Sequence, residues 1–254
     1  MSDNRILITL FQKNFVVCAA LLKLGTAAPA GDWLKFSEEQ IRGESSSAKL
    51  SMEIETPDWK RTLEINADSA GDSKSLIFIT SPAKEKGVGT LRLENKMWNY
   101  FPKLKKTVVV SPSMLLTGWM GSDFTNDDLL KASSLAKDYS HKYLADEKVE
   151  GENYLVVEGM AKGDAKVIWP KIVVLLSYKS CLPVYQRYYD KKGTLIRTLK
   201  LSAVKEIDKH TIPTVWEMQP ADKKSQKTIL KYQEVDYDTS FSSSHFNLKT
   251  LERD

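Results

Sequence analysis

The stretch Lys96–Leu130, KMWNYFPKLKKTVVVSPSMLLTGWMGSDFTNDDLL, contains the signals that decide the fold class. Its first part predicts two strands, Met97–Phe101 and Thr107–Val110, because aromatic and β-branched residues favour strands and a proline closes each run. A bulky apolar segment, residues 114–120, then precedes a polar helix start. Connections are normally polar, so this segment either fills a core or covers an apolar opening.

Outside this stretch the chain shows strand periodicity. Residues 48–55 alternate between apolar and polar side chains, which is typical of a half-buried strand. About eleven such short strands are evenly spaced, and only two short helices interrupt them, one of them starting at a capping box of Thr125 and Asp128. A sheet of this size must curl. We therefore expect a mainly β (α+β) chain with one antiparallel sheet or open barrel, and no boundary between domains.

The N-terminus resembles a secretory signal. Arg5 and Lys13 give a positive region, Phe15–Leu22 is a short apolar core, and Ala28-Pro29-Ala30 is an A-x-A cleavage site. We expect residues 1–30 to be removed and residues 31–254 to form a periplasmic domain. The alternative is an N-terminal anchor that is retained.

Cleavage has a consequence for the cysteines. Only Cys181 would remain of the two, so the mature chain is expected to contain no intramolecular disulfide. A lipid-modified Cys18 is discounted, because no small residue directly precedes it. Cleavage would also lower the formal net charge from +4 to +2 (34 basic and 32 acidic residues), which is too balanced to argue for a nucleic-acid partner.

Catalytic and metal motifs are not evident. His141, His210 and His245 are far apart in sequence, without cysteine or carboxylate at ligand spacing. No G-x-S-x-G elbow occurs, and the acids at 123, 127 and 128 suit a helix N-terminus better than a calcium loop. The sequence therefore predicts no enzyme, no metal site and no cofactor.

The apolar side chains of the central stretch are the candidate lipid-binding residues. They are Trp98, Tyr100, Met114, Leu115, Leu116, Trp119 and Met120. Flexible thioethers suit surfaces that repack around variable partners, although such clusters are also typical of a core. If residues 114–120 form a lid, the segment should be mobile and Trp119→Ala should cost little stability.

Lys103, Lys105 and Lys106 form the one local basic cluster. They are candidates for contact with anionic lipid headgroups. The alternative is a solvated hairpin turn.

Three motifs carry a resemblance to a known family: residues 81–87 (SPAKEKG), 97–102 (MWNYFP) and 119–129 (WMGSDFTNDDL), with YYD at 188–190 and TIP at 211–213 further on. With them the chain, from about Gly43 to Leu251, resembles the LolA-like superfamily of outer-membrane lipoprotein-sorting proteins, in its uncharacterised periplasmic branch. The resemblance implies an incomplete antiparallel barrel with a short helical lid. Its apolar cavity would receive the acyl chains of lipoproteins or lipids for transfer to the outer membrane.

One feature of the family has no clear match. The archetypal carrier uses an arginine to control lid opening, and Arg61, on an early strand, is the candidate here, although no motif identifies it. Members of this branch are associated with resistance-nodulation-division type exporters. The second hypothesis is therefore a partner that carries no lipid and docks on such an inner-membrane exporter or on another envelope protein.

Overall fold

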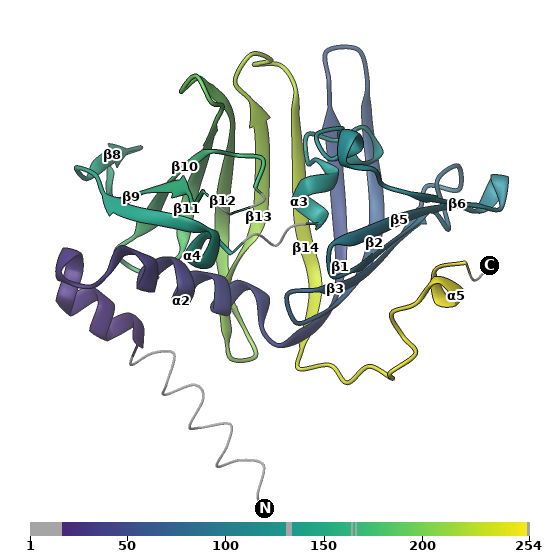
Figure 1. Ribbon diagram of the computed structural model, residues 1–254, viewed down its shortest axis with the longest axis horizontal. Helices are drawn as coiled ribbons and strands as arrows, with labels where there is room; N and C mark the ends of the chain where they lie inside the picture. The colour runs from purple at the N-terminus through teal and green to yellow at the C-terminus, as the bar shows by residue number, and fades with distance from the viewer. Residues whose placement is uncertain (1–16, 131–133, 164, 166, 253–254) are drawn as a thin grey trace, which may run out of the picture. The chain divides into compact units, whose positions relative to one another are not determined.

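The computed structural model describes residues 17–130, 134–163, 165 and 167–252 (Figure 1). The strands are β1 (Ser45–Glu55), β2 (Lys60–Ala70), β3 (Lys74–Ser81), β4 (Gly89–Leu93), β5 (Lys96–Phe101), β6 (Lys106–Val109), β7 (Tyr139–Tyr143), β8 (Glu147–Val149), β9 (Glu152–Ala161), β10 (Lys171–Ser177), β11 (Pro183–Tyr189), β12 (Leu195–Ile207), β13 (His210–Pro220) and β14 (Lys227–Tyr237). The α-helices are α2 (Ala30–Arg42), α3 (Asn126–Leu130), α4 (Leu135–Asp138) and α5 (Leu248–Leu251). Short 3-10 turns are η1 (Gly25–Ala27), η2 (Pro102–Leu104), η3 (Pro112–Met114) and η4 (Trp119–Gly121).

The sheet is antiparallel and is not closed. Its path runs β6-β5-β4-β3-β2-β1-β14-β13-β12-β11-β10-β9-β7, with β8 paired to β9. The prediction of a mainly β chain with an open antiparallel sheet is confirmed, but the count of about eleven strands is wrong, since the described residues form fourteen. The three-residue strand β8 is too short to show alternation, and so the sequence pattern misses it.

The chain divides into two compact units, and each is built from two separate chain segments. Unit 1 consists of residues 1–41 and 133–213, and unit 2 of residues 42–132 and 214–254. The boundary at 41/42 falls within α2 and that at 213/214 within β13, so neither lies in a linker. The expected single domain of residues 31–254 stays a prediction.

In unit 2 the two faces of the sheet differ in character. Met52 and Ile54 on β1 are buried on one face, while Glu53 and Glu55 point to the other, as strand geometry requires. We call these the Met52 face and the Glu53 face. Residues that pair across neighbouring strands lie on the same face of the sheet. The pairings therefore show which residues of β2, β3, β4, β5, β13 and β14 lie on each face.

The C-terminal segment covers part of the Glu53 face. Leu251 of α5 is fully buried in a cluster with Leu76, Leu91 and Tyr100. A Cβ atom on Gly89 would lie only 2.7 Å from Leu251 Cδ1, which is too close for van der Waals contact. β4 therefore needs glycine at this position. His245 bonds Asp68 on β2 at 2.8 Å and stacks on Phe241.

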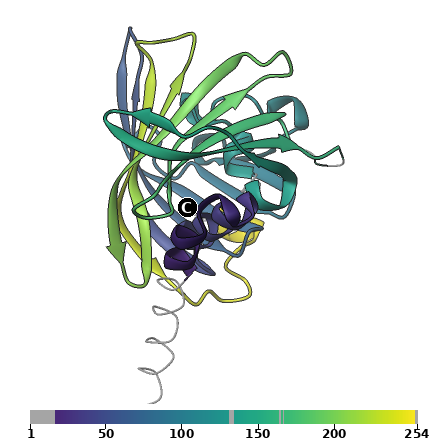
Figure 2. The same ribbon diagram turned by 90° about the vertical axis from the view of Figure 1, so that its left-hand side faces the viewer.

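In unit 1, helix α2 packs on the strands through Trp33 and Leu34, which are fully buried. Figure 2 shows α2, in purple, beside the teal strands of this unit. Two contacts fix its start: Tyr143 on β7 donates to the carbonyl of Ala28 at 2.6 Å, and Gly31 lies against the His141 ring. A second cluster (Val156, Val173, Leu175 and Tyr185) is joined by Val149 of β8.

Residues 17–24 are helical, and Cys18 forms a disulfide with buried Cys181. The expectation that Cys181 has no disulfide partner therefore applies only to a chain cleaved after Ala30. Arg5 and Lys13 of the predicted signal lie outside the described residues.

Candidate functional site

Residues 114–120, the apolar loop, do not form a regular helix. Two 3-10 turns, η3 and η4, lie at its ends, and Met120 has a left-handed backbone with φ of 52°. Asn126 holds the loop in shape, because its Nδ2 donates to the Met114 carbonyl and to the Thr117 hydroxyl, both at 3.0 Å. The predicted helical lid is thus a hydrogen-bonded loop that precedes the five-residue helix α3.

Trp119 is fixed on the Met52 face rather than mobile. Its side chain is 2% exposed, and its Nε1 donates to the Thr90 hydroxyl at 3.0 Å. Thr90 in turn donates to Asn99 Oδ1 at 2.7 Å. Buried polar groups bonded in this way specify one arrangement, so the expectation that Trp119 tolerates truncation has to be corrected.

The other members of the loop are less buried. Leu116 is 56% exposed, while Met114, Leu115 and Met120 are intermediate. The loop therefore combines one buried tryptophan with four apolar side chains that remain partly accessible.

Arg61 contacts the loop directly. It pairs with Ile54 across β1 and β2 and so lies on the Met52 face. Its Nη2 donates to the carbonyl of Met120, and its Nη1 lies 3.4 Å from Glu85 Oε1. Sequence reasoning named Arg61 without a motif, and the structure places it at the end of the apolar loop.

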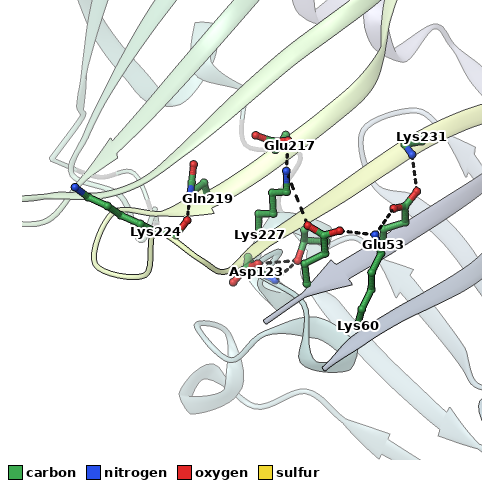
Figure 3. A network of polar contacts seen from close by, with 10 residues as sticks. Glu53, Lys60, Asp123, Glu217, Gln219, Lys224, Lys227 and Lys231 are labelled. Atoms are coloured by element: carbon green, nitrogen blue, oxygen red, sulfur yellow. Dashed lines mark hydrogen bonds and ion pairs between the residues drawn. The ribbon is translucent and has the colours of Figure 1, made fainter. Parts of the chain in front are cut away.

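The chain after the loop is held on β14. Asp123 Oδ2 accepts from the Thr228 hydroxyl at 2.8 Å, and its backbone N–H donates back to the same hydroxyl at 2.9 Å. Figure 3 shows Asp123 beside a chain of ion pairs in which Lys60 and Lys231 contact Glu53, and Lys227 contacts Glu217. The predicted capping box is confirmed, since Asp128 Oδ2 accepts from the Thr125 N–H at 2.7 Å.

Two aromatic residues that sequence reasoning missed lie on the Met52 face. Trp216 pairs with Leu230, and Tyr232 pairs with Leu50, so both share the face of the apolar loop. Their rings are 5.9 Å apart, and both side chains are partly exposed. Burial raises the pKa of Tyr232 to about 12, which indicates surroundings that solvate charge poorly. The alternation of side chains along β13 and β14 was the sequence signal that could have placed them on this face.

Trp98 and Tyr100 lie on the other side of the sheet. They pair with Leu91 and Gly89, on the Glu53 face, where Phe246 and Leu251 pack against them. The structure therefore does not bring them together with the apolar loop. Their predicted contact with lipid stays a prediction.

Lys103, Lys105 and Lys106 are all exposed in and after η2, between β5 and β6. They lie on a turn of unit 2 rather than beside Trp119, whose contacts are to β4 and to residues of its own loop.

Within the described ranges, no three His, Cys, Asp or Glu side chains are grouped so as to hold a metal ion. A search of the same residues for a helix long and apolar enough to cross a membrane finds none.

A family model described as an uncharacterized protein matches residues 71–253. A domain named for outer membrane lipoprotein sorting, from Vibrio parahaemolyticus, has a similar structure, with a TM-score of 0.77, 24% identity, and coverage of 88% of this chain and 98% of that one. A LolA superfamily protein from Nitrosomonas europaea gives a TM-score of 0.74 and 21% identity, with 87% and 99% covered. The chain belongs to the family of the matching model, and it has the fold of these two solved structures.

A DUF1329 family protein from Desulfovibrio piger is similar to this chain as well, with a TM-score of 0.80, 21% identity, and coverage of 87% of this chain and 97% of that one. A search of the curated proteins finds no match. At these identities the solved structures establish the fold alone, and the function of this chain has to be argued from its own residues.

Proposed function

We propose that this LolA-like protein is a periplasmic carrier that binds the acyl chains of lipoproteins or lipids on the Met52 face of unit 2, beneath the apolar loop. The observation that supports it best is the loop itself. Trp119 and Arg61 hold its C-terminal end, while Met114, Leu115, Leu116 and Met120 stay partly accessible. The fold shared with the lipoprotein-sorting domain supports the same class of cargo.

The energetics favour such binding. Burying ten methylenes of an acyl chain contributes about 8 kcal/mol before association costs, which is sufficient for micromolar affinity. Trp216 and Tyr232 supply aromatic surface on the same face, in surroundings that raise the pKa of Tyr232 to about 12. In this proposal Arg61 restrains the loop, and its release from the Met120 carbonyl accompanies loading.

Displacement of a fluorescent fatty acid tests the proposal. The wild type should bind saturably at micromolar concentration, and Trp216→Ala should weaken binding about tenfold or more, because an aromatic wall of the site is lost. Trp98→Ala is the comparison, because it removes a partly buried tryptophan from the opposite face. A site on the Met52 face alone leaves its affinity unchanged, whereas a loss would support the predicted contact of Trp98 with lipid. If binding of the fatty acid is not saturable, the carrier proposal is wrong, and a docking partner that carries no lipid is favoured.

Arg61 is tested by rates rather than by affinity alone. Arg61→Leu should speed both uptake and release of the fluorescent fatty acid, because the loop loses its bond at Met120, whereas Arg61→Lys should have an intermediate effect. Stopped-flow fluorescence measures both rates. Unchanged rates in Arg61→Leu would show that this residue is only structural.

A further inference from the structure

The turn between β5 and β6, residues 102–106, exposes a large apolar side chain among positive charges. Leu104 is 72% exposed, and Lys103, Lys105 and Lys106 beside it are exposed as well. The turn has a defined shape: Pro102 begins η2, and the Lys105 N–H donates to the Pro102 carbonyl at 3.0 Å. The exposed leucine is therefore held at a fixed place in the turn.

Within the residues that the structure describes, no carboxylate neutralises the charge of this turn. None of its three lysines forms an ion pair with any residue in the described part of the chain, whereas Lys60, Lys227 and Lys231 of the same unit all contact carboxylates (Figure 3). One carboxylate, Glu252, does contact the hairpin, but it accepts from the Thr107 hydroxyl at 2.5 Å. The lysines thus remain available to an external anion.

The position of the turn leaves it accessible. β6 is the outermost strand of unit 2, and the turn lies at its start (Figure 1). Val109, further along β6, is 59% exposed, so the apolar character of the hairpin is not confined to Leu104.

We propose that the β5–β6 turn binds the surface of an anionic phospholipid bilayer. Leu104 enters the boundary between headgroups and acyl chains, and the three lysines contact lipid phosphates while their aliphatic stems follow the leucine. The membrane surface would be the place where the carrier loads or releases its cargo, and this part of the proposal rests on the proposed function. An acidic protein would satisfy the lysines but would not need an exposed leucine among them.

Co-sedimentation of the exported protein with vesicles tests the proposal. At low salt, wild type should bind vesicles of phosphatidylcholine and phosphatidylglycerol in equal parts, and not vesicles of phosphatidylcholine alone. Replacing Lys103, Lys105 and Lys106 by Gln should weaken partitioning about a hundredfold, since each lysine contributes about fivefold near an anionic surface. Leu104→Asn, which keeps the charge and the approximate size, should weaken it about tenfold.

The matched control removes the same number of charges elsewhere. Replacing Lys191, Lys223 and Lys224 by Gln changes exposed lysines of two other turns that contain no leucine, and binding should stay within about twofold of wild type. No binding by the wild type would overturn the proposal and leave an acidic protein as the partner. An equal loss in the control variant, or no loss in Leu104→Asn, would overturn it too, because the attraction would then be general charge alone.

The two proposals fail separately. All of these variants should bind the fluorescent fatty acid with wild-type affinity, because the turn contributes no side chain to the site on the Met52 face. A protein that binds vesicles but not fatty acid would refute the carrier and retain the membrane contact.

Discussion

Trp119 shows at the scale of one residue how a loop can be both apolar and ordered. Its indole lies buried on β4, and its N–H reaches Thr90, which in turn bonds Asn99. Leu116, three residues earlier, is mostly exposed. One segment thus contains a residue that stabilises the fold and another that is available to a ligand.

We expect Trp119→Ala to lower the free energy of unfolding by about 3–5 kcal/mol, since it leaves a cavity and removes the hydrogen bond that the Thr90 hydroxyl accepts from the indole. Leu116→Ala is the control and should change it by less than about 0.5 kcal/mol. Urea unfolding measures both variants. Equal, small changes would restore the interpretation of the whole loop as a mobile lid.

The same residues show what the sequence could and could not predict about the site. The motif around Trp119 identified the loop, and the capping box at Thr125 predicted where α3 begins. The facing of Trp98 away from the loop could not be predicted, because alternation tells which residues share a face but not which face meets the loop. The contact between Arg61 and Met120 joins residues far apart in sequence, and no local pattern encodes it.

At the scale of elements, strands whose apolar and polar side chains alternate clearly, such as β1 and its partner β2, were predicted from the sequence. The three-residue strand β8 was missed. Figure 3 shows another feature that local patterns do not encode, the ion pairs that join β1, β2, β13 and β14. In this network the hydrogen bond from Lys231, followed by the contact of Lys60, holds the pKa of Glu53 below its ordinary value of 4.5.

A lowered folded-state pKa has a definite sign for stability. Glu53 contributes stability above its unfolded pKa, near 4.5, and this contribution is lost as the pH falls through the lower folded-state value. Glu53→Gln should therefore lower the free energy of unfolding by about 1 kcal/mol at pH 7, and the difference from wild type should shrink below about pH 4.5.

Urea unfolding between pH 7 and pH 3 checks this expectation. Glu234→Gln is the control, because its pair with Lys49 is largely exposed and should contribute almost nothing. A difference for Glu53→Gln that stays constant across the range would contradict the linkage.

At the scale of the whole molecule, the predicted processing after Ala30 conflicts with the folded arrangement of the same residues. Ala28 and Ala30 are buried, and Ala30 is the first residue of α2. Proteases cut exposed and unfolded segments, so cleavage would have to occur before α2 packs.

We expect the exported product to begin at Gly31 and to contain one free thiol, Cys181, because its disulfide partner Cys18 is removed with the signal. An uncleaved chain would contain no free thiol, since Cys18 and Cys181 are bonded to each other. Intact mass and thiol titration without reductant distinguish the two. Full-length protein with no thiol, recovered from membranes, would show that the N-terminus is retained.

The division of unit 2 into two distant chain segments also governs when it can fold. Strands β1 to β6 pair with their sequence neighbours, but β1 needs β14 on its other edge, with Ser46 opposite Tyr237. As the chain emerges from synthesis or translocation, β1 therefore presents an open edge until nearly everything else has appeared. Such long-range pairing is slow, and an open edge recruits other strands. We therefore expect β1 to be open to mispairing with other strands until β14 has emerged.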